Sequence, residues 1–161
     1  MNAPSITRAQ IGRCGELLTQ YRLLRLGIDS ALMTTDSGVD LVAYVPGYRE
    51  ARTIQVKTIE KPAAAGGRGK TELTWWFAPH CPAEFVAFVS LHTEQIWIFT
   101  LAEANELAQQ RPAHGLKAHL YMHLEDVRTR SGHARTHVDH FDDFLIERRL
   151  PAVLMNSPPD A

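Results

Sequence analysis

Residues 38–58 read GVDLVAYVPGYREARTIQVKT and decide the fold of this chain. Two runs rich in β-branched residues, 39–45 and 51–59, flank the turn-forming triplet Pro46-Gly47-Tyr48. This pattern predicts an antiparallel hairpin.

The predicted hairpin brings three polar side chains to one face. A turn centred between Gly47 and Tyr48 places Asp40 opposite Gln55, and opposed residues share a face. Because side chains alternate along a strand, Lys57 lies on that face too, diagonal to Asp40 and roughly 7–8 Å from it at the backbone. We therefore expect Asp40, Gln55 and Lys57 to form the functional site. An ordinary solvated face is the alternative.

The other face of the hairpin is consistently apolar and belongs in the core. Its members are Val39, Leu41, Ala43, Val45, Ile54 and Val56. A slip of one residue would bury Gln55 and Lys57 and expose this apolar set, so the pattern specifies the register.

A helix is predicted before the hairpin, over residues 7–26. Thr7 and Gln10 have the spacing of a capping box, and Gly27 sits where a left-handed C-terminal cap is expected. The residues expected to form its buried stripe are Ile11, Cys14, Leu17, Leu18, Tyr21 and Leu24. A strand over residues 28–34 should link this helix to the hairpin.

The remaining elements follow from shorter signals. Residues 61–70 combine Gly, Ala and basic residues without periodicity, which predicts a surface loop. Aromatic and β-branched runs predict strands at 73–78, 84–91 and 95–100, the last two paired through a turn at 92–94. Helices are expected at 101–110 and around 141–149.

Length and composition favour one domain of an intracellular protein. The chain has 161 residues, 45% of them hydrophobic, a net charge of −1 and a pI near 6.7. No global positive field is present, so any binding of nucleic acid must be local. Cys14 and Cys81 form no CxxC pair, and no long apolar segment is found, which predicts a cytoplasmic protein without a membrane span.

The order of these features resembles the PD-(D/E)XK nuclease superfamily. The residues that carry the resemblance are Gly12-x3-Glu16 and Gly27 in the first helix, Gly38-Val39-Asp40-Leu41, and Ile54-Gln55-Val56-Lys57-Thr58. The resemblance implies an α/β fold, a central mixed β-sheet flanked by helices with a restriction endonuclease-like (Holliday-junction-resolvase-like) αβββαβ core. A single domain would span 1–161, with its core at about 7–110, a helical extension at about 111–150 and a tail at 151–161.

The resemblance also implies a reaction. Asp40, Gln55 and Glu16 would bind Mg²⁺, or Mn²⁺ in its place, and Lys57 would stabilise charge on the phosphate or orient the attacking water. The expected activity is endonucleolytic hydrolysis of DNA, including structured or branched DNA. A homodimer is expected at the family level for enzymes that cut both strands.

Gln55 departs from the family pattern, which usually has Glu or Asp at this place. The departure supports a rival function, a catalytically inactive scaffold that binds nucleic acid or a protein partner. Lys57 favours the enzyme, because such a scaffold has no evident need for a lysine beside the carboxylate.

Basic residues in two polar segments are candidate contacts to nucleic acid. They are Arg68, Lys70, Arg128, Arg130 and Arg135. A bland surface loop is the alternative for both segments.

Three other features of the sequence are weaker candidates for a functional site. His133, His137 and His140 have partly helical metal-ligand spacing, but a solvated segment explains them better. Among the adjacent aromatic residues 75–77, at least one should be core, since neighbours in a strand face opposite ways. Cys81 beside His80 has no support as a nucleophile, because sequence neighbours rarely face each other.

Overall fold

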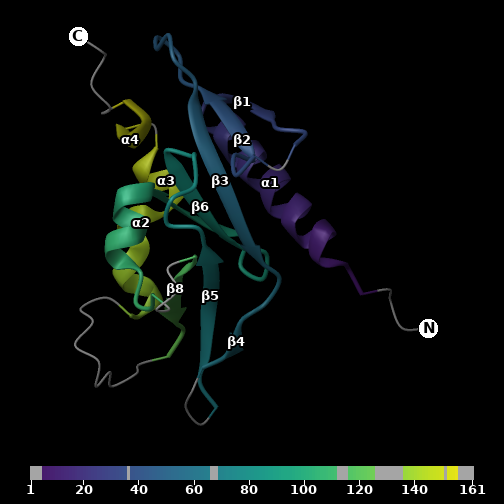
Figure 1. The fold of residues 1–161 in the computed structure, drawn as a ribbon, viewed down its shortest axis with the longest axis vertical. Helices are drawn as coiled ribbons and strands as arrows, with labels where there is room; N and C mark the ends of the chain where they lie inside the picture. Colours follow the sequence, from purple (N-terminus) through teal and green to yellow (C-terminus); the bar gives the residue numbers. More distant parts are fainter. Residues whose placement is uncertain are drawn as a thin grey trace.

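A five-stranded mixed sheet, called sheet A, forms the centre of the fold (Figure 1). The computed structural model describes residues 5–35, 37–65, 69–111, 116–125, 136–150 and 152–155. Sheet A has the order β1-β2-β3-β6-β7, with β3 and β6 parallel and the other neighbours antiparallel. Its strands are β1 Asp29–Leu32, β2 Leu41–Tyr44, β3 Arg52–Ile59, β6 Phe85–Ser90 and β7 Gln95–Thr100.

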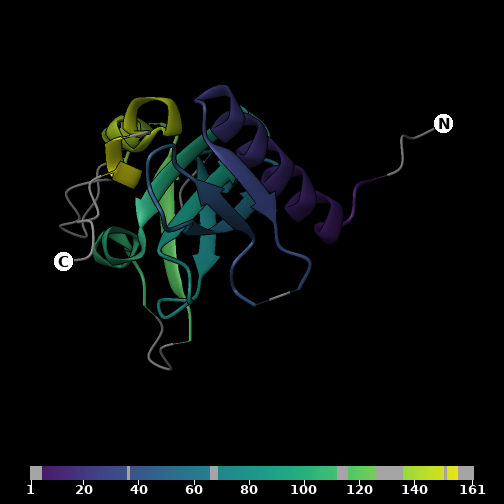
Figure 2. The ribbon, with the colours of Figure 1, turned by 90° about the horizontal axis from the view of Figure 1, so that it is seen from above.

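Further elements cover both faces of sheet A. They are α1 Arg8–Arg25, β4 Ala63–Ala64, β5 Thr71–Phe77, α2 Leu101–Leu107, β8 Ala118–His123, the 3-10 helix η1 Val138–Phe144, α3 Ile146–Arg149 and α4 Ala152–Met155. Leu23 of α1 and Ile146 of α3 pack on one face. On the other face, α2, η1 and a second sheet of order β4-β5-β8, called sheet B, enclose a second core (Figure 2). The predicted α/β class, with a mixed sheet between helices, is confirmed.

The register of the hairpin is the predicted one. Leu41 pairs with Ile54, and Ala43 pairs with Arg52. Leu41, Ala43 and Ile54 are fully buried, as expected for the apolar face. The strands before and after the hairpin, and the pairing of β6 with β7, also follow the prediction.

The ends of α1 are the predicted ones as well. Thr7 and Gln10 form a reciprocal capping box. At the other end Gly27 adopts φ +77°, its N–H donates to Leu24, and the N–H of Ile28 donates to Leu23. These two bonds make a Schellman cap, in which glycine avoids the strain of a left-handed conformation.

The predicted buried stripe of α1 is wrong at four of its members, whereas Leu18 packs partly buried against the core as expected. The four exposed members are Cys14, Leu17, Tyr21 and Leu24. The helix turns Gly15, Thr19 and Leu23 toward the sheet, while Leu17 and Tyr21 are about half exposed. The physical reason is close approach, because a Cβ on Gly15 would collide with the Thr58 side chain of β3. Only small residues let the helix pack this near the sheet.

The αβββαβ order is kept only through β3. The connection from β3 to the parallel strand β6 passes through β4 and β5 of sheet B, where that order has a helix. The predicted loop at 61–70 thus contains β4, and β8 had no predicted counterpart. The helix predicted around 141–149 is η1 followed by the short α3.

Residues 138–150 wrap around the β7 edge of sheet A. Phe141 and Phe144 are buried in the core under sheet B, whereas Ile146 and Leu150 are buried on the α1 side. Between them, Leu145 forms an isolated bridge with Trp97 of β7. This segment therefore covers an edge that would otherwise expose unpaired backbone groups.

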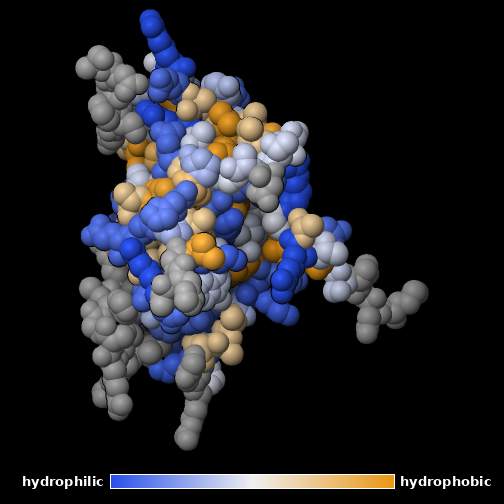
Figure 3. Space-filling model, viewed as in Figure 1, coloured by the Kyte–Doolittle hydropathy of each residue, from blue (hydrophilic) through white to orange (hydrophobic). Residues whose placement is uncertain are grey.

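Hydrophobic and hydrophilic side chains are interspersed on the face shown in Figure 3. Among the described residues, no helix is long and apolar enough to cross a membrane.

Candidate functional site

Asp40 lies directly before β2 and is held by strands on both sides. Its carbonyl oxygen accepts from the N–H of Met33 at 2.9 Å, and its N–H donates to the carbonyl of Ile54 at 2.9 Å. One carboxylate oxygen, Oδ2, accepts from the N–H of Val56 at 2.6 Å. The carboxylate thus serves as an acceptor for the neighbouring strand β3, and its position is fixed by backbone.

Gln55 of β3 is only 5% exposed. Its Nε2 donates to the carbonyl oxygen of Gly38 at 3.2 Å, while its Oε1 is buried and has no hydrogen-bond partner among the described residues. Because only the NH₂ group can donate to a carbonyl, this bond fixes which way the amide points. The explanation of an ordinary solvated face therefore does not hold for Gln55.

Gly38 positions that amide and has no room for a side chain. It adopts φ +80°, and a Cβ there would lie 2.8 Å from the ring of Pro82 and 3.9 Å from Nε2 of Gln55. The glycine of the motif is thus required by both conformation and space.

Lys57 shares a face of β3 with Gln55. The parallel register pairs Gln55 with Val86 and Lys57 with Phe88, so all four side chains point to the same side of sheet A. Lys57 is partly buried, and no hydrogen bond or ion pair of its ammonium occurs within the described part of the chain. Its charge remains available to an anion.

Glu16 is not brought to this face. Its helix packs on the other face of β3, where Gly15 meets Thr58. The Glu16 carboxylate accepts from Arg13 at 2.9 Å. Among described residues, no three His, Cys, Asp or Glu side chains are grouped to hold a metal ion.

Of the five basic residues proposed to contact nucleic acid, four lie outside the described residues. These four are Arg68, Arg128, Arg130 and Arg135. Lys70 directly precedes β5, near His123 and Glu125. The structure therefore leaves these contacts as predictions.

The aromatic run and the histidines are now placed in part. Trp75 and Phe77 are core, as expected, while Trp76 is 45% exposed and stacks on His119 with ring centroids 4.1 Å apart. His133 lies outside the described residues. Within the described part of the chain, His137 and His140 belong to no group of three side chains that could hold a metal ion.

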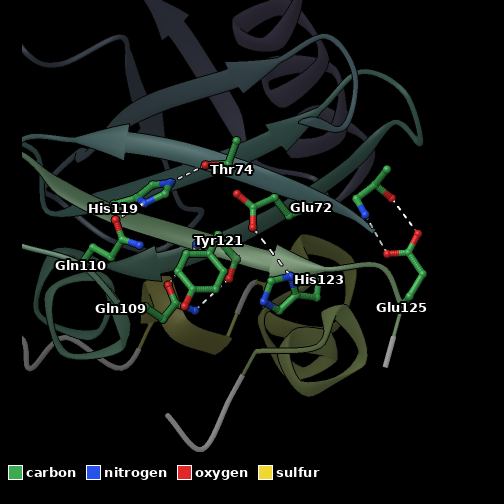
Figure 4. Close-up of polar contacts among 9 residues, drawn as sticks. Glu72, Thr74, Gln109, Gln110, His119, Tyr121, His123 and Glu125 are labelled. Atoms are coloured by element: carbon green, nitrogen blue, oxygen red, sulfur yellow. Dashed lines mark hydrogen bonds and ion pairs between the residues drawn. The ribbon is translucent and has the colours of Figure 1, made fainter. Parts of the chain in front are cut away.

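A second polar cluster, which sequence reasoning missed, lies on the outer face of sheet B (Figure 4). Gln109 binds the edge of β8 with both amide atoms, donating from Nε2 to the carbonyl of Tyr121 at 2.8 Å and accepting at Oε1 from its N–H at 3.0 Å. The ring of His119 contacts the hydroxyl of Thr74 and the side chain of Gln110. These contacts join residues that are distant in the sequence, so they form only when β5 and β8 pair in the fold.

Burial favours the neutral forms of that cluster. It lowers the pKa of His119 and is the largest cause of the lowered pKa of His123. It also raises the pKa of Glu72, whose carboxylate lies 3.7 Å from Nδ1 of His123. Several groups of the cluster bond to one another, although Nδ1 of His123 has no hydrogen-bond partner among the described residues.

The hairpin site has a different chemistry. The Asp40 carboxylate and the free Oε1 of Gln55 are hard oxygen donors, the type that Mg²⁺ and Mn²⁺ prefer. Lys57 adds a positive charge on the same face as Gln55. Together these groups suit a cation and a bound anion.

The comparisons with known proteins concern the fold. No protein-family model and no curated protein sequence matches this chain. Among solved structures, it is similar to the bacterial homing endonuclease I-Ssp6803I, with a TM-score of 0.60 and 14% sequence identity. The similarity covers 96% of this chain and 100% of that one. At this identity the similarity shows a shared fold.

Proposed function

We propose that this protein is a metal-dependent endonuclease that hydrolyses phosphodiester bonds in DNA, with a PD-(D/E)XK-type site of the Gln-x-Lys variant. The observation that carries the proposal is the buried Oε1 of Gln55, which has no hydrogen-bond partner among the described residues. Gly38 fixes this amide beside the start of the strand that holds Asp40. A buried acceptor without a partner is costly, and a bound cation or an ordered water can satisfy it. The fold shared with a homing endonuclease supports the same reaction.

Asp40 and Gln55 are the proposed direct ligands of Mg²⁺, with Mn²⁺ as a substitute. Mg²⁺ often keeps several waters and needs only one or two carboxylates from the protein, so one carboxylate and one amide oxygen suit it. Glu16 is not included in the proposed ligand set, because its helix packs on the opposite face of β3 and its carboxylate is paired with Arg13. The cation would supply charge neutralisation and a more acidic water.

Lys57 is proposed to stabilise the charge that develops on the scissile phosphate. It has no described partner to give up when an anion arrives, so its charge acts without a competing ion pair. Arg68, Lys70, Arg128, Arg130 and Arg135 stay proposed contacts to the DNA backbone. A cytoplasmic location stays a prediction.

The test of this proposal is DNA cleavage. Supercoiled plasmid, single-stranded DNA and branched DNA are incubated with the purified protein and Mg²⁺ or Mn²⁺, beside Asp40→Asn. Asparagine keeps an acceptor for the N–H of Val56 but removes the charge, so nicking should be lost while the fold stays. Asp29→Asn, at an exposed carboxylate of β1, is the matched control and should cut normally. Metal-dependent nicking that survives Asp40→Asn would overturn the site.

A catalytically inactive scaffold that binds nucleic acid or a protein partner is the second candidate function. Two observations favour it, the neutral Gln55 and the lack of a group of three metal-binding side chains among described residues. Absence of cleavage on every DNA form, together with no Mg²⁺ or Mn²⁺ binding by calorimetry, would select this scaffold over the enzyme.

A further inference from the structure

A row of large apolar side chains runs along the outer side of α1. We call Cys14, Leu17, Tyr21 and Leu24 the outer stripe. Leu17 is 47% exposed, Tyr21 51% and Leu24 61%, and Cys14 is exposed as well. Gly15, Thr19 and Leu23 form the opposite side of the helix, against sheet A. The helix thus turns Gly15 and Thr19 toward the core together with Leu23, and leaves four apolar side chains outside.

The spacing of the outer stripe is that of a coiled-coil seam. Its members follow one another at intervals of three, four and three residues, the a and d positions of a heptad. Isolated exposed leucines are ordinary, but a continuous seam of this kind marks an interaction surface. In the ribbon views α1 is the outermost layer on its side of sheet A, so another helix can reach it (Figure 2).

We propose that α1 packs antiparallel against α1 of a second copy of this chain. The outer stripe is complementary to itself in this orientation, with a two-fold axis near Thr19. Cys14 would meet Leu24 of the partner subunit, and Leu17 would meet Tyr21 of the partner subunit. Each layer joins one larger and one smaller side chain, which helps facing helices interdigitate. An interface that repeats the same contacts twice is the usual form of a two-fold dimer.

The charges beside the outer stripe permit this pairing. Arg13 and Gln20 border the stripe on one side, and Leu18 and Arg25 border it on the other. In this register Arg13 is level with Arg25 of the partner subunit but borders the opposite side of the seam, so the two arginines do not face each other. Arg13 is also paired with Glu16 within its own helix.

The available area sets the strength of the dimer. The three half-exposed side chains contribute an apolar area on the order of 300 Å² per copy. Two copies of this area amount to about 600 Å², below the standard size of a specific interface, so the residues that border the outer stripe must contribute the rest. We therefore expect a concentration-dependent dimer. This inference does not rest on the proposed nuclease activity, although a dimer would carry two copies of the site.

Sedimentation velocity of the full chain tests the interface, without DNA or metal, over about 1 to 100 μM protein. The wild type should shift from monomer to dimer, and Leu17→Glu should stay monomeric throughout. Leu116→Glu is the matched control, because this leucine is 80% exposed and lies outside α1. It should dimerise like the wild type. A wild type that is monomeric at every concentration, or a Leu17→Glu variant that still dimerises, would overturn the proposal.

Thiol cross-linking tests the orientation in a Cys81→Ser background. With Leu24→Cys, a short bis-maleimide should link Cys14 to the new thiol of the partner subunit and give a covalent dimer. Cys14 alone should not link to itself, because ten residues along antiparallel helices separate the two copies by about 15 Å. Efficient linking of Cys14 to its own copy would overturn the antiparallel arrangement. Neither result depends on cleavage, so failure here and failure of the proposed function are distinguishable.

Discussion

Two buried glutamines, one in each sheet, show how differently the same side chain is used. Gln55 in sheet A and Gln109 at the edge of sheet B are 5% and 9% exposed. Both amide atoms of Gln109 are bonded to the backbone of Tyr121. Gln55 bonds only through Nε2, to Gly38, and keeps a buried Oε1 without a described partner. The two amides therefore differ in hydrogen bonding more than in burial, and together with the neighbouring Asp40 this difference makes Gln55 the candidate ligand.

The largest expected effect is on DNA cleavage, at Lys57, the charged residue that shares a face of β3 with Gln55. Lys57→Met should lower DNA cleavage about 10³-fold, or ~4 kcal/mol in the activation free energy, because a preorganised charge at the phosphate is lost. The melting temperature should barely change, since Lys57 has no described partner. Cleavage rates and thermal unfolding measure the two effects. Lys61→Met, at an exposed lysine after β3, should leave both unchanged; a comparable loss of cleavage there would remove the special role of Lys57.

The second largest expected effect is on the stability of the fold, at Gln109. Gln109→Glu should destabilise the fold by about 3 kcal/mol, because a buried carboxylate replaces the donor to Tyr121 and meets its carbonyl oxygen. For a chain of this length that is a fall of roughly 6–12 °C in melting temperature. Scanning calorimetry measures it, and metal binding should not change. A variant of normal stability would show that Gln109 is not the structural partner of the pair.

The matched change at Gln55 should act on metal binding as well as on the fold. Gln55→Glu replaces a neutral oxygen ligand by a charged one, so the affinity for Mg²⁺ or Mn²⁺ should rise about tenfold, or ~1.4 kcal/mol. The loss of the Nε2 bond to Gly38 subtracts some stability when metal is absent. Isothermal calorimetry of both variants decides the comparison. Equal metal affinity in wild type and Gln55→Glu would argue against Gln55 as a ligand.

The hairpin could be predicted from sequence because its information is local. Alternating apolar residues, a turn triplet and two β-branched runs specify a register, and the structure pairs Leu41 with Ile54 accordingly. The capping box at Thr7 and Gln10 and the cap at Gly27 are local in the same way. Such features need no knowledge of what packs against them.

The buried face of α1 could not be predicted in this way. The sequence pattern chose Leu17 and Tyr21 as buried, but the contact between Gly15 and Thr58 turned the small residues inward. That contact joins residues distant in the chain, so no local pattern reveals it. The exposure of this apolar stripe, which the sequence pattern did not predict, is also the observation that supports the proposed dimer.

β8 and the polar cluster of sheet B were missed for a related reason, although β5 was predicted. β8 has the sequence AHLYMH, in which three polar or aromatic side chains alternate with three buried apolar ones, yet it lies beyond a stretch without clear signals. The role of Gln109 is visible only in the fold, where its side chain bonds to the backbone of Tyr121. The sequence also does not reveal that Oε1 of Gln55 lacks a partner among the described residues. This depends on the hydrogen bond that Nε2 donates to the carbonyl oxygen of Gly38 in the fold.

The smallest predicted effect is the pH dependence of sheet B. Burial lowers the pKa of His119 and is the main cause of the lowered pKa of His123, so the unfolded chain binds protons more readily than the fold does. Their contribution to stability is therefore complete above the ordinary value near 6.5 and is lost as the pH falls below it. Glu72, whose pKa burial raises above 4.5, works in the opposite sense and offsets part of the loss.

The melting temperature should accordingly fall by a few degrees between pH 7 and pH 5. A variant with His119→Gln and His123→Gln should be less stable at pH 7 but show a flatter pH profile, because the groups that titrate are gone. His92→Gln, at an exposed histidine, should keep the wild-type slope. Thermal unfolding across this pH range measures all three proteins. If the double variant kept the wild-type slope, the acid sensitivity would lie outside sheet B, and its cluster would lose the structural role that sets it apart from the site at Gln55.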